Sequence, residues 1–243
     1  MPNLYSNNND GYITSSNVPS WAGARDDTSG SANTGTTVAS SFTAAGRFAS
    51  RGGGNTYMVS RSFMYFDTSG ITGTVSAATI KIRGYGYNDG SIIAVKSDAF
   101  GGDGGTALAN TDLNNIVGYS TGSSLAGNAT DYSNSITGSS WSRSGYNDLT
   151  GTSDLRADMQ NNNVVIICFM DYTNDYLNSA VGSNVYLNYG AYMTNYTGTS
   201  RDPYIEYTVA STGYANNVNG VASANIGKIN GVATASIEKV NGI

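Results

Sequence analysis

Short runs of β-branched and aromatic residues, separated by clusters of Gly, Asn, Asp and Ser, recur along this chain of 243 residues. No window of about 15 residues carries apolar positions at helical spacing without a glycine among them, so long amphipathic helices are not expected. Repeated short strands with turn signals between them are typical of a β-sandwich or barrel. One domain is sufficient for this length, because all-β sandwiches reach about 200–250 residues as a single unit.

The predicted strands differ in how their faces are covered. In residues 79–83, two isoleucines alternate with a lysine and an arginine, which predicts one buried and one solvent-facing side. Residues 164–170 are apolar at every position and are expected to form a central strand that is covered on both faces. The complete set of predicted strands is 57–66, 79–83, 91–96, 164–170, 185–189 and 204–209.

One short helix is expected at residues 153–160, where Leu155 and Met159 form an apolar i, i+4 pair. The Gly-, Ser- and Asn-rich stretch 101–146 predicts long loops and irregular edge strands. We therefore expect an all-β fold, an antiparallel jelly-roll-like β-sandwich with one short helix and an extended, repeat-containing carboxy-terminal tail. The expected boundaries are an amino-terminal arm at 1–10, the sandwich at 11–211 and the tail at 212–243.

The tail repeats with a period of eleven residues, and its units start at Val218, Ile229 and Val240. Each unit carries Asn-Gly, which disfavours a helix and favours tight turns, so we expect extended segments joined by turns. Two and a third units cannot bury an apolar face alone. We expect them to dock on copies of the same chain, as in a trimer or another homo-oligomer, or on another protein. The expected assembly residues are Val218, Val221, Ile226, Ile229, Val232, Ile237, Val240 and Ile243.

Several kinds of catalytic chemistry are excluded by residues that the chain lacks. There is no histidine, which removes Ser-His-Asp and Cys-His machinery and nearly all His-dependent metal sites. The single cysteine, Cys168, lies inside the apolar run and is expected to be a buried, inert thiol. We therefore expect a non-enzymatic protein. A polysaccharide depolymerase that uses a carboxylate pair is the alternative left open, since such hydrolysis needs only two Asp or Glu beside a cleft.

Charge and hydropathy exclude two classes of partner. The net charge is −5, and the 12 Lys and Arg residues form no cluster, so no nucleic-acid partner is expected. The longest apolar run, 164–170, is far shorter than the roughly 20 residues of a membrane-spanning helix, so no membrane insertion is expected. The first residues lack the basic and apolar regions of a secretion signal. We expect a protein that is made in a cytoplasm.

Aromatic residues suggest a candidate glycan site. Trp21 and Trp141 could stack on sugar rings, and the Asn- and Tyr-rich segment that carries Tyr172 and Tyr176 could add hydrogen bonds. The alternative for both tryptophans is that they fill the core of the sandwich. The sequence thus permits a polysaccharide ligand.

Oxygen-bearing side chains in predicted turns suggest a structural Ca²⁺ site. Such a site takes about six to eight oxygen ligands, which Asp, Asn and backbone carbonyls in loops can supply. The candidates are Asp67, Asp89, Asp98 and Asp103. No other cofactor is expected.

One segment resembles a known family. Arg61, Phe63 and the run Phe66-Asp67-Thr68-Ser69 are followed by Ala77, Ile80 and Ile82. This order resembles the opening strands of DNRLRE-type β-sandwich domains, which are similar to carbohydrate-binding modules. Residues 201–207 resemble the closing strand of those domains, and residues 146–155 resemble the segment that leads into their short helix.

The resemblance implies a β-sandwich domain with one of two functions. Domains of this type occur in secreted polysaccharide-binding proteins and in bacteriophage virion proteins, and residues 10–30 look like the phage version. The Asn-Gly-Val repeats of the tail resemble those of structural proteins in environmental tailed phages. The resemblance therefore implies a virion structural protein, of decoration or fibre type, on the capsid or tail surface, with the tail mediating oligomerisation or docking to other virion proteins. The alternative is an adhesion module that binds cell-surface or extracellular polysaccharide.

Overall fold

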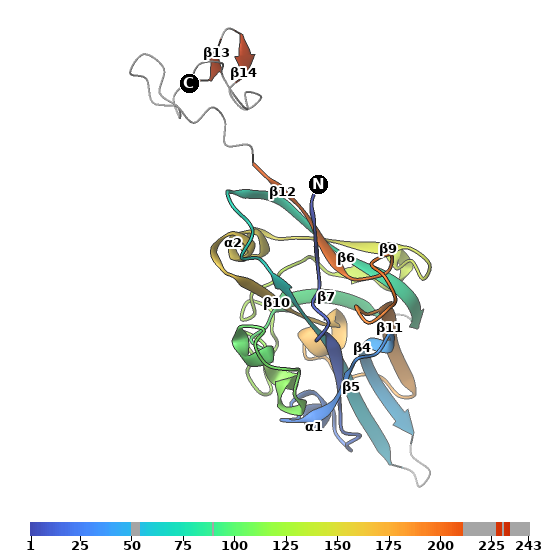
Figure 1. Ribbon diagram of the computed structural model, residues 1–243. Helices are drawn as coiled ribbons and strands as arrows, with labels where there is room; N and C mark the ends of the chain where they lie inside the picture. Colours follow the sequence, from blue (N-terminus) through green and yellow to red (C-terminus); the bar gives the residue numbers. More distant parts are fainter. Residues whose placement is uncertain (50–53, 89, 211–226, 230, 234–243) are drawn as a thin grey trace.

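The computed structural model describes residues 1–49, 54–88, 90–210, 227–229 and 231–233. Twelve strands of the described chain form one antiparallel sheet (Figure 1). These strands are β1 (Asn3–Tyr5), β2 (Gly11–Ser15), β3 (Gly30–Thr34), β4 (Val38–Ala49), β5 (Asn55–Asp67), β6 (Val75–Asn88), β7 (Ser91–Lys96), β8 (Ile136–Thr137), β9 (Tyr146–Thr150), β10 (Val164–Asp171), β11 (Val185–Tyr192) and β12 (Tyr204–Val209). The main path through the sheet is β1-β12-β6-β11-β4-β5-β10-β7-β8, and β2, β3 and β9 pair beside it.

Two long strands make the sheet curl. Residues 75–81 of β6 pair with β12, whereas residues 84–88 pair with β11. In the same way, residues 55–60 of β5 pair with β4, whereas residues 62–67 pair with β10. Because each long strand changes partner along its length, the two ends of the sheet path turn toward each other. The prediction of a mostly β fold with few helices is confirmed.

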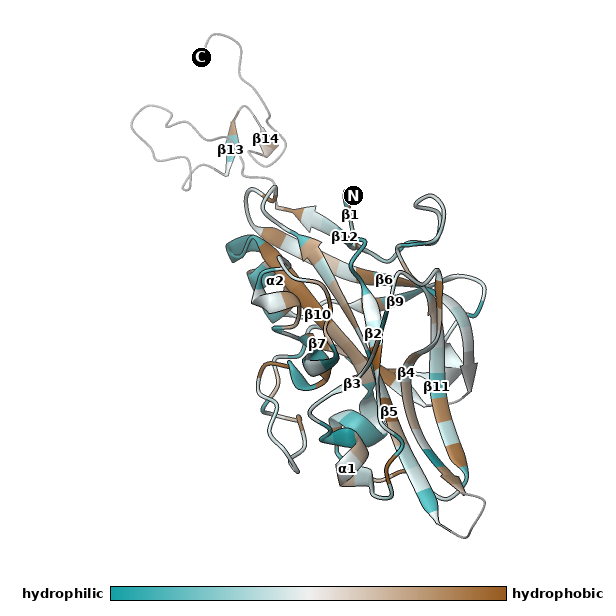
Figure 2. Cartoon of the chain, turned by 60° about the horizontal axis from the view of Figure 1, so that its bottom comes forward, coloured by the Kyte–Doolittle hydropathy of each residue, from teal (hydrophilic) through white to brown (hydrophobic). Residues whose placement is uncertain are grey.

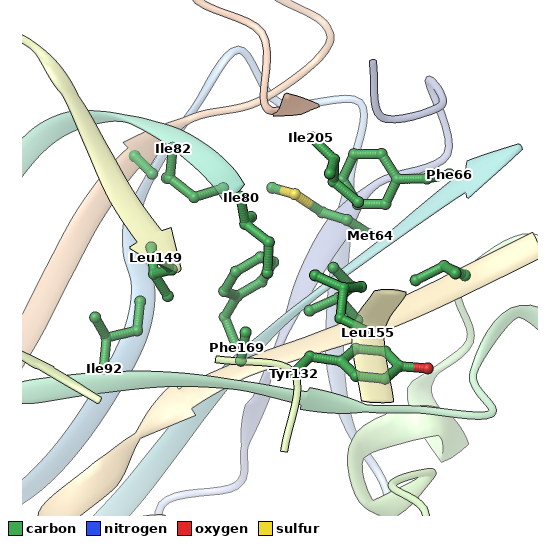
Figure 3. Close-up of a cluster of buried hydrophobic side chains, with 14 of the residues drawn as sticks. Met64, Phe66, Ile80, Ile82, Ile92, Tyr132, Leu149, Leu155, Phe169 and Ile205 are labelled. Carbon is green, nitrogen blue, oxygen red and sulfur yellow. The ribbon is translucent and has the colours of Figure 1, made fainter. Parts of the chain in front are cut away.

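The main hydrophobic core lies inside the curl (Figure 3). Ile80, Leu149 and Ile205, from β6, β9 and β12, share this core with Phe169 of β10, and all four side chains are fully buried. Phe42 of β4 closes the same core, with its ring centroid 5.1 Å from that of Phe169. Burial of each such side chain stabilises the fold by about 1.5–3 kcal/mol before entropy.

The strand β10 is covered on both faces, as its sequence predicts. Its second face packs under the loops that follow β7, where Leu108, Leu113 and Leu125 cover Cys168. Cys168 is a free, fully buried thiol, and burial raises its pKa. In Figure 2 the strand β10 is largely hydrophobic, whereas the hydrophilic colour gathers on the helices and turns outside it.

Six strands agree with the predicted runs, and one long strand was missed. β7 and β12 have the predicted bounds, and β5, β6, β10 and β11 extend beyond them. β4 reads VASSFTAAGRFA, which is rich in residues of low β propensity. Pairing with β5 on one side and β11 on the other holds it in the sheet. Tertiary pairing therefore overrides local preference at β4.

The predicted short helix is α2 (Ser153–Asn161). Thr152 caps it by accepting a hydrogen bond from the backbone N–H of Leu155, and Leu155 and Met159 are buried. The expectation of a single helix was wrong, because α1 (Trp21–Arg25) and the π-helical turn η4 (Tyr172–Tyr176) also form. Each spans five residues, too few to show a helical period in the sequence. Every helix in the described ranges is too short to span a membrane.

Loops dominate the stretch between β7 and β9, as predicted. They contain the short 3₁₀ turns η1 (Phe100–Gly102), η2 (Asn110–Asn114) and η3 (Gly138–Ser140). In the amino-terminal arm, β1 pairs with β12 and the Ser6 N–H donates to the Pro203 carbonyl at 3.0 Å. The segment 1–10 is therefore a part of the sheet and its margin.

Candidate functional site

The two tryptophans of the predicted glycan site lie in the interior. Trp21 is 8% exposed, and its Nε1 donates to Asn178 Oδ1 at 3.1 Å. Trp141 is 5% exposed and packs edge-on against Tyr189, with ring centroids 4.8 Å apart. Neither indole presents a free face to a sugar, so their predicted glycan role is corrected to that of core residues.

The two tyrosines of the same prediction stack on each other. The rings of Tyr172 and Tyr176 lie 5.3 Å apart in η4. Tyr176 is buried, and its hydroxyl hydrogen-bonds to the carboxylate of Asp131 at 2.9 Å, while Tyr172 is half-buried. Trp21, Trp141 and Tyr176 belong to three different hydrophobic clusters. The predicted residues therefore do not form one glycan-binding surface.

The predicted calcium ligands are not brought together. Asp67 accepts hydrogen bonds from the hydroxyl and N–H of Ser69, which hold the pKa of its carboxyl below the usual value. Asp103 caps its own turn by accepting from the Gly105 N–H at 2.8 Å, and Asp98 is exposed. Asp89 lies outside the described residues. In the described ranges no three Asp, Glu or Cys side chains gather as a metal-binding group.

One unit of the tail is described in part. β13 (Lys228–Ile229) pairs with β14 (Val232–Ala233) around Gly231, whose φ is +82°. This short hairpin agrees with the predicted extended segments joined by a turn. Val232 is 50% exposed and Ile229 is half-buried. The other predicted assembly residues lie outside the described residues: Val218, Val221, Ile226, Ile237, Val240 and Ile243.

A row of tyrosines follows the outer side of β1, β12, β9 and β6. Tyr5 lies against Tyr204 with ring centroids 5.5 Å apart, and Tyr204 lies against Tyr146 at 5.1 Å. The guanidinium of Arg83 sits 5.9 Å from the centre of the Tyr146 ring. Two residues along β6, on the same side, Tyr85 continues the row.

The row ends around the last residues of β11. The rings of Tyr85 and Tyr192 are 5.8 Å apart, and those of Tyr192 and Tyr196 are 5.2 Å apart. Arg201 lies over both of the latter rings, at 4.6 and 4.5 Å. We call this surface the tyrosine face; its members are Tyr5, Tyr85, Tyr146, Tyr192, Tyr196 and Tyr204.

The tyrosine face combines exposed rings with charged groups. Tyr85 is 52% exposed and Tyr5 is 38% exposed, whereas the other four rings are half-buried. Lys81, beside the row, contacts Asp148 at 2.6 Å and Glu206 at 3.8 Å. Aromatic faces with hydrogen-bonding groups around them suit ligands that have both apolar and hydroxyl-bearing sides.

The sequence analysis missed this face because strand pairing assembles it. Tyr146 faces Arg83 across the β9–β6 pair, and Tyr204 faces Lys81 across the β12–β6 pair. The available signal was the alternation in residues 79–83, which assigned Lys81 and Arg83 to the outer side. Continuing that alternation by two positions reaches Tyr85.

A separate polar hollow of about 630 Å³ opens where α2 leads into β10. It is lined by Lys96, Asp103, Tyr132 and the three consecutive amides Asn161, Asn162 and Asn163. These groups offer hydrogen-bond donors and acceptors in similar number. The hollow can therefore hold a small hydroxyl-rich molecule.

Asp158 fixes three of the groups around the hollow. Lys96 Nζ and the Tyr132 hydroxyl donate to its Oδ2 at 2.8 and 2.5 Å, and Asn162 Nδ2 donates to its Oδ1 at 2.9 Å. Burial tends to raise the pKa of Asp158, but the bonds from Lys96 and Tyr132 outweigh it and hold the pKa below the usual value. The carboxylate thus stays ionised and orients its neighbours.

A buried ionic cluster joins Arg25, Arg61 and Asp175, whose side chains are all fully buried. Arg61 donates two hydrogen bonds of 2.7 Å to the Asp175 carboxylate and a third to the Leu113 carbonyl. Arg25 donates to the carbonyls of Asp175 and Ser123. Because its main donors are satisfied within the chain, this cluster ties loops to β5 and α1. Arg61, which the resemblance singles out, has this structural role.

Comparison with known proteins adds no further constraint. No protein-family model matches the chain, and no curated protein is similar to it in sequence.

Proposed function

We propose that this chain is a non-catalytic binding protein that contacts polysaccharide through the tyrosine face. The observation that carries the proposal is two groups of three contacting tyrosines with Arg83 between them, of which Tyr85 is the most exposed ring. Sugar rings have apolar C–H faces that pack on aromatic rings and hydroxyls that pair with charged side chains. Lys81, Asp148 and Glu206 provide such partners next to the rings.

The shape of the face favours a chain over a single sugar. The tyrosines follow one another across several strands, so an extended polymer contacts several rings at once. The hydrophobic core between β6, β9 and β12 and the strands β5, β7 and β10 supports the further inference that the curled sheet is a jelly-roll-like sandwich. A rigid sheet holds the rings in place before the ligand arrives, which lowers the entropic cost of binding.

The experiment is polysaccharide binding by the purified chain, measured on a glycan array and then by calorimetry with the best ligand. Tyr85→Ala removes the most exposed ring without opening the core. We expect affinity to fall by up to about tenfold, because one aromatic contact contributes about 0.5–1.5 kcal/mol.

Phe48→Ala is the matched control. Phe48 is 36% exposed and packs against Tyr186 near the carboxy-terminal end of β4, and neither residue belongs to the tyrosine face. Its removal should leave polysaccharide affinity unchanged. Equal losses in both variants, or no polysaccharide bound by the parent chain, would contradict the proposal.

A structural role on a phage virion is the second candidate, and the β13–β14 hairpin favours it. Its half-exposed Val232 is an apolar residue that a partner surface would cover. The repeat tail would then mediate oligomerisation or docking, and the tyrosine face would point away from the particle. Incorporation of a tail-truncated chain into particles tests this role.

A further inference from the structure

Three segments that are distant in the sequence meet at the amino-terminal margin of the sheet. The Ser6 N–H donates to the Pro203 carbonyl at 3.0 Å, and the Thr194 hydroxyl donates to the Asn7 carbonyl at 3.1 Å. The Thr194 N–H donates to Oδ2 of Asp10 at 3.0 Å. The segments around residues 6–10, 193–195 and 202–203 are therefore packed together.

Two carboxylates are buried at this junction without full pairing. Asp10 is 1% exposed and Asp202 is 6% exposed. Oδ1 of each residue is buried and has no hydrogen-bond partner. Within the described chain neither carboxylate forms an ion pair. The nearby Arg201 is engaged with Tyr192 and Tyr196.

A buried carboxylate oxygen without a partner is costly, and proteins relieve the cost with a proton or a cation. A divalent cation bound by the free oxygens of both side chains compensates both negative charges, whereas a single proton compensates only one.

We propose that Asp10 and Asp202 hold a hard divalent cation of the Ca²⁺ type, which fastens the amino-terminal segment to the start of β12. Such an ion prefers carboxylate and carbonyl oxygens, with water filling the remaining positions. The chain has no histidine, and no thiol lies among these segments, so the softer ligands that zinc prefers are missing here. The site differs from the ligands predicted from sequence, and it does not depend on the proposed function.

The experiment follows Tb³⁺ and Ca²⁺ binding to the full chain after treatment with EDTA. Tb³⁺ emits when an excited tyrosine lies close to it, and the Tyr146 hydroxyl donates to the Asp202 carbonyl at 3.1 Å. We expect saturable Tb³⁺ emission that Ca²⁺ displaces, and a rise in Tm on addition of Ca²⁺. Asp202→Asn and Asp10→Asn should each weaken Tb³⁺ binding at least tenfold.

Two further variants and one stability measurement distinguish loss of the cation site from non-specific Tb³⁺ binding and from misfolding. Asp98→Asn and Asp103→Asn, at exposed carboxylates, should bind Tb³⁺ as the parent chain does. Metal-free Asp202→Asn should be at least as stable as the metal-free parent, because the amide removes a buried charge, so lost emission cannot be ascribed to misfolding. The proposal is overturned if Ca²⁺ leaves Tm unchanged while acidification raises it, or if Asp202→Asn binds Tb³⁺ normally.

Discussion

At the scale of single residues, we expect the buried charged side chains to have the largest effect on the free energy of unfolding. Asp175 pairs with the buried Arg61 at 2.7 Å and shares the buried Arg25 with Asp26, whereas Asp148 pairs with Lys81 at the surface and is 56% exposed. Removal of one partner from a buried pair leaves an uncompensated charge, which is much more costly than the loss of an exposed pair. The same chemical change should therefore have very different effects at the two positions.

We expect Asp175→Asn to lower the free energy of unfolding by about 3–5 kcal/mol, since Arg61 stays buried and charged but loses the carboxylate with which it pairs. Asp148→Asn, the control, should cost no more than about 1 kcal/mol. Urea unfolding followed by circular dichroism measures both. Similar losses in the two variants would show that the buried cluster does not hold the loops to β5.

At the scale of elements, a helix cap anchors α2 to the body. The Thr152 hydroxyl accepts from the Leu155 N–H and donates to the Asp131 carbonyl at 2.6 Å. It therefore starts the helix and ties it to the loop before β8. The adjacent Ser153 is exposed and does not cap the helix.

Thr152→Ala should lower the free energy of unfolding by about 0.5–2 kcal/mol, because one helix N–H loses its acceptor. Ser153→Ala, the neighbouring control, should stay within about 0.5 kcal/mol of the parent chain. Thermal unfolding of the two variants provides the comparison. A larger loss of stability in Ser153→Ala than in Thr152→Ala would show that Thr152 is not the residue that caps α2.

At the scale of the whole molecule, we expect the sheet to fold around its own core without the tail. The core cluster draws its residues from the strands between β4 and β12 and from α2, all of which precede residue 211. Folding and assembly should be separable properties of this chain.

Deletion of residues 218–243 should leave Tm within a few degrees of that of the full chain, while oligomerisation or incorporation into particles is lost. Differential scanning calorimetry and light scattering on the truncated chain measure the two effects. A tail with charged residues in place of Val232 and Ile229 provides a control of unchanged length. Normal assembly of the truncated chain would contradict a docking role of the tail.

Patterns that lie within a few neighbouring residues were predictable from the sequence. The alternation around Ile80, the apolar run of β10 and the pair Leu155 and Met159 each led to the right element and the right buried side. These features depend on local periodicity, which a strand or helix imposes on its own residues. The missed β4 lacks such a pattern, and backbone pairing with β5 and β11 holds it in the sheet instead.

The sites depended on which strands become neighbours, and only the tertiary structure decided that. Local sequence cannot tell an exposed tyrosine from a buried tryptophan, so the glycan surface predicted from the sequence contains Trp21 and Trp141, whereas the proposed one contains Tyr85 and Tyr204. Asp10 and Asp202 stand far apart in the chain and belong to one junction because Ser6 bonds to Pro203 and Thr194 bonds to Asp10. By itself, then, the sequence determined the β-rich class and the burial pattern of its strongest strands, because local periodicity encodes both. The tertiary structure decided the tyrosine face, the Arg25–Arg61–Asp175 cluster and the paired carboxylates, because each needs contacts that only long-range strand pairing creates.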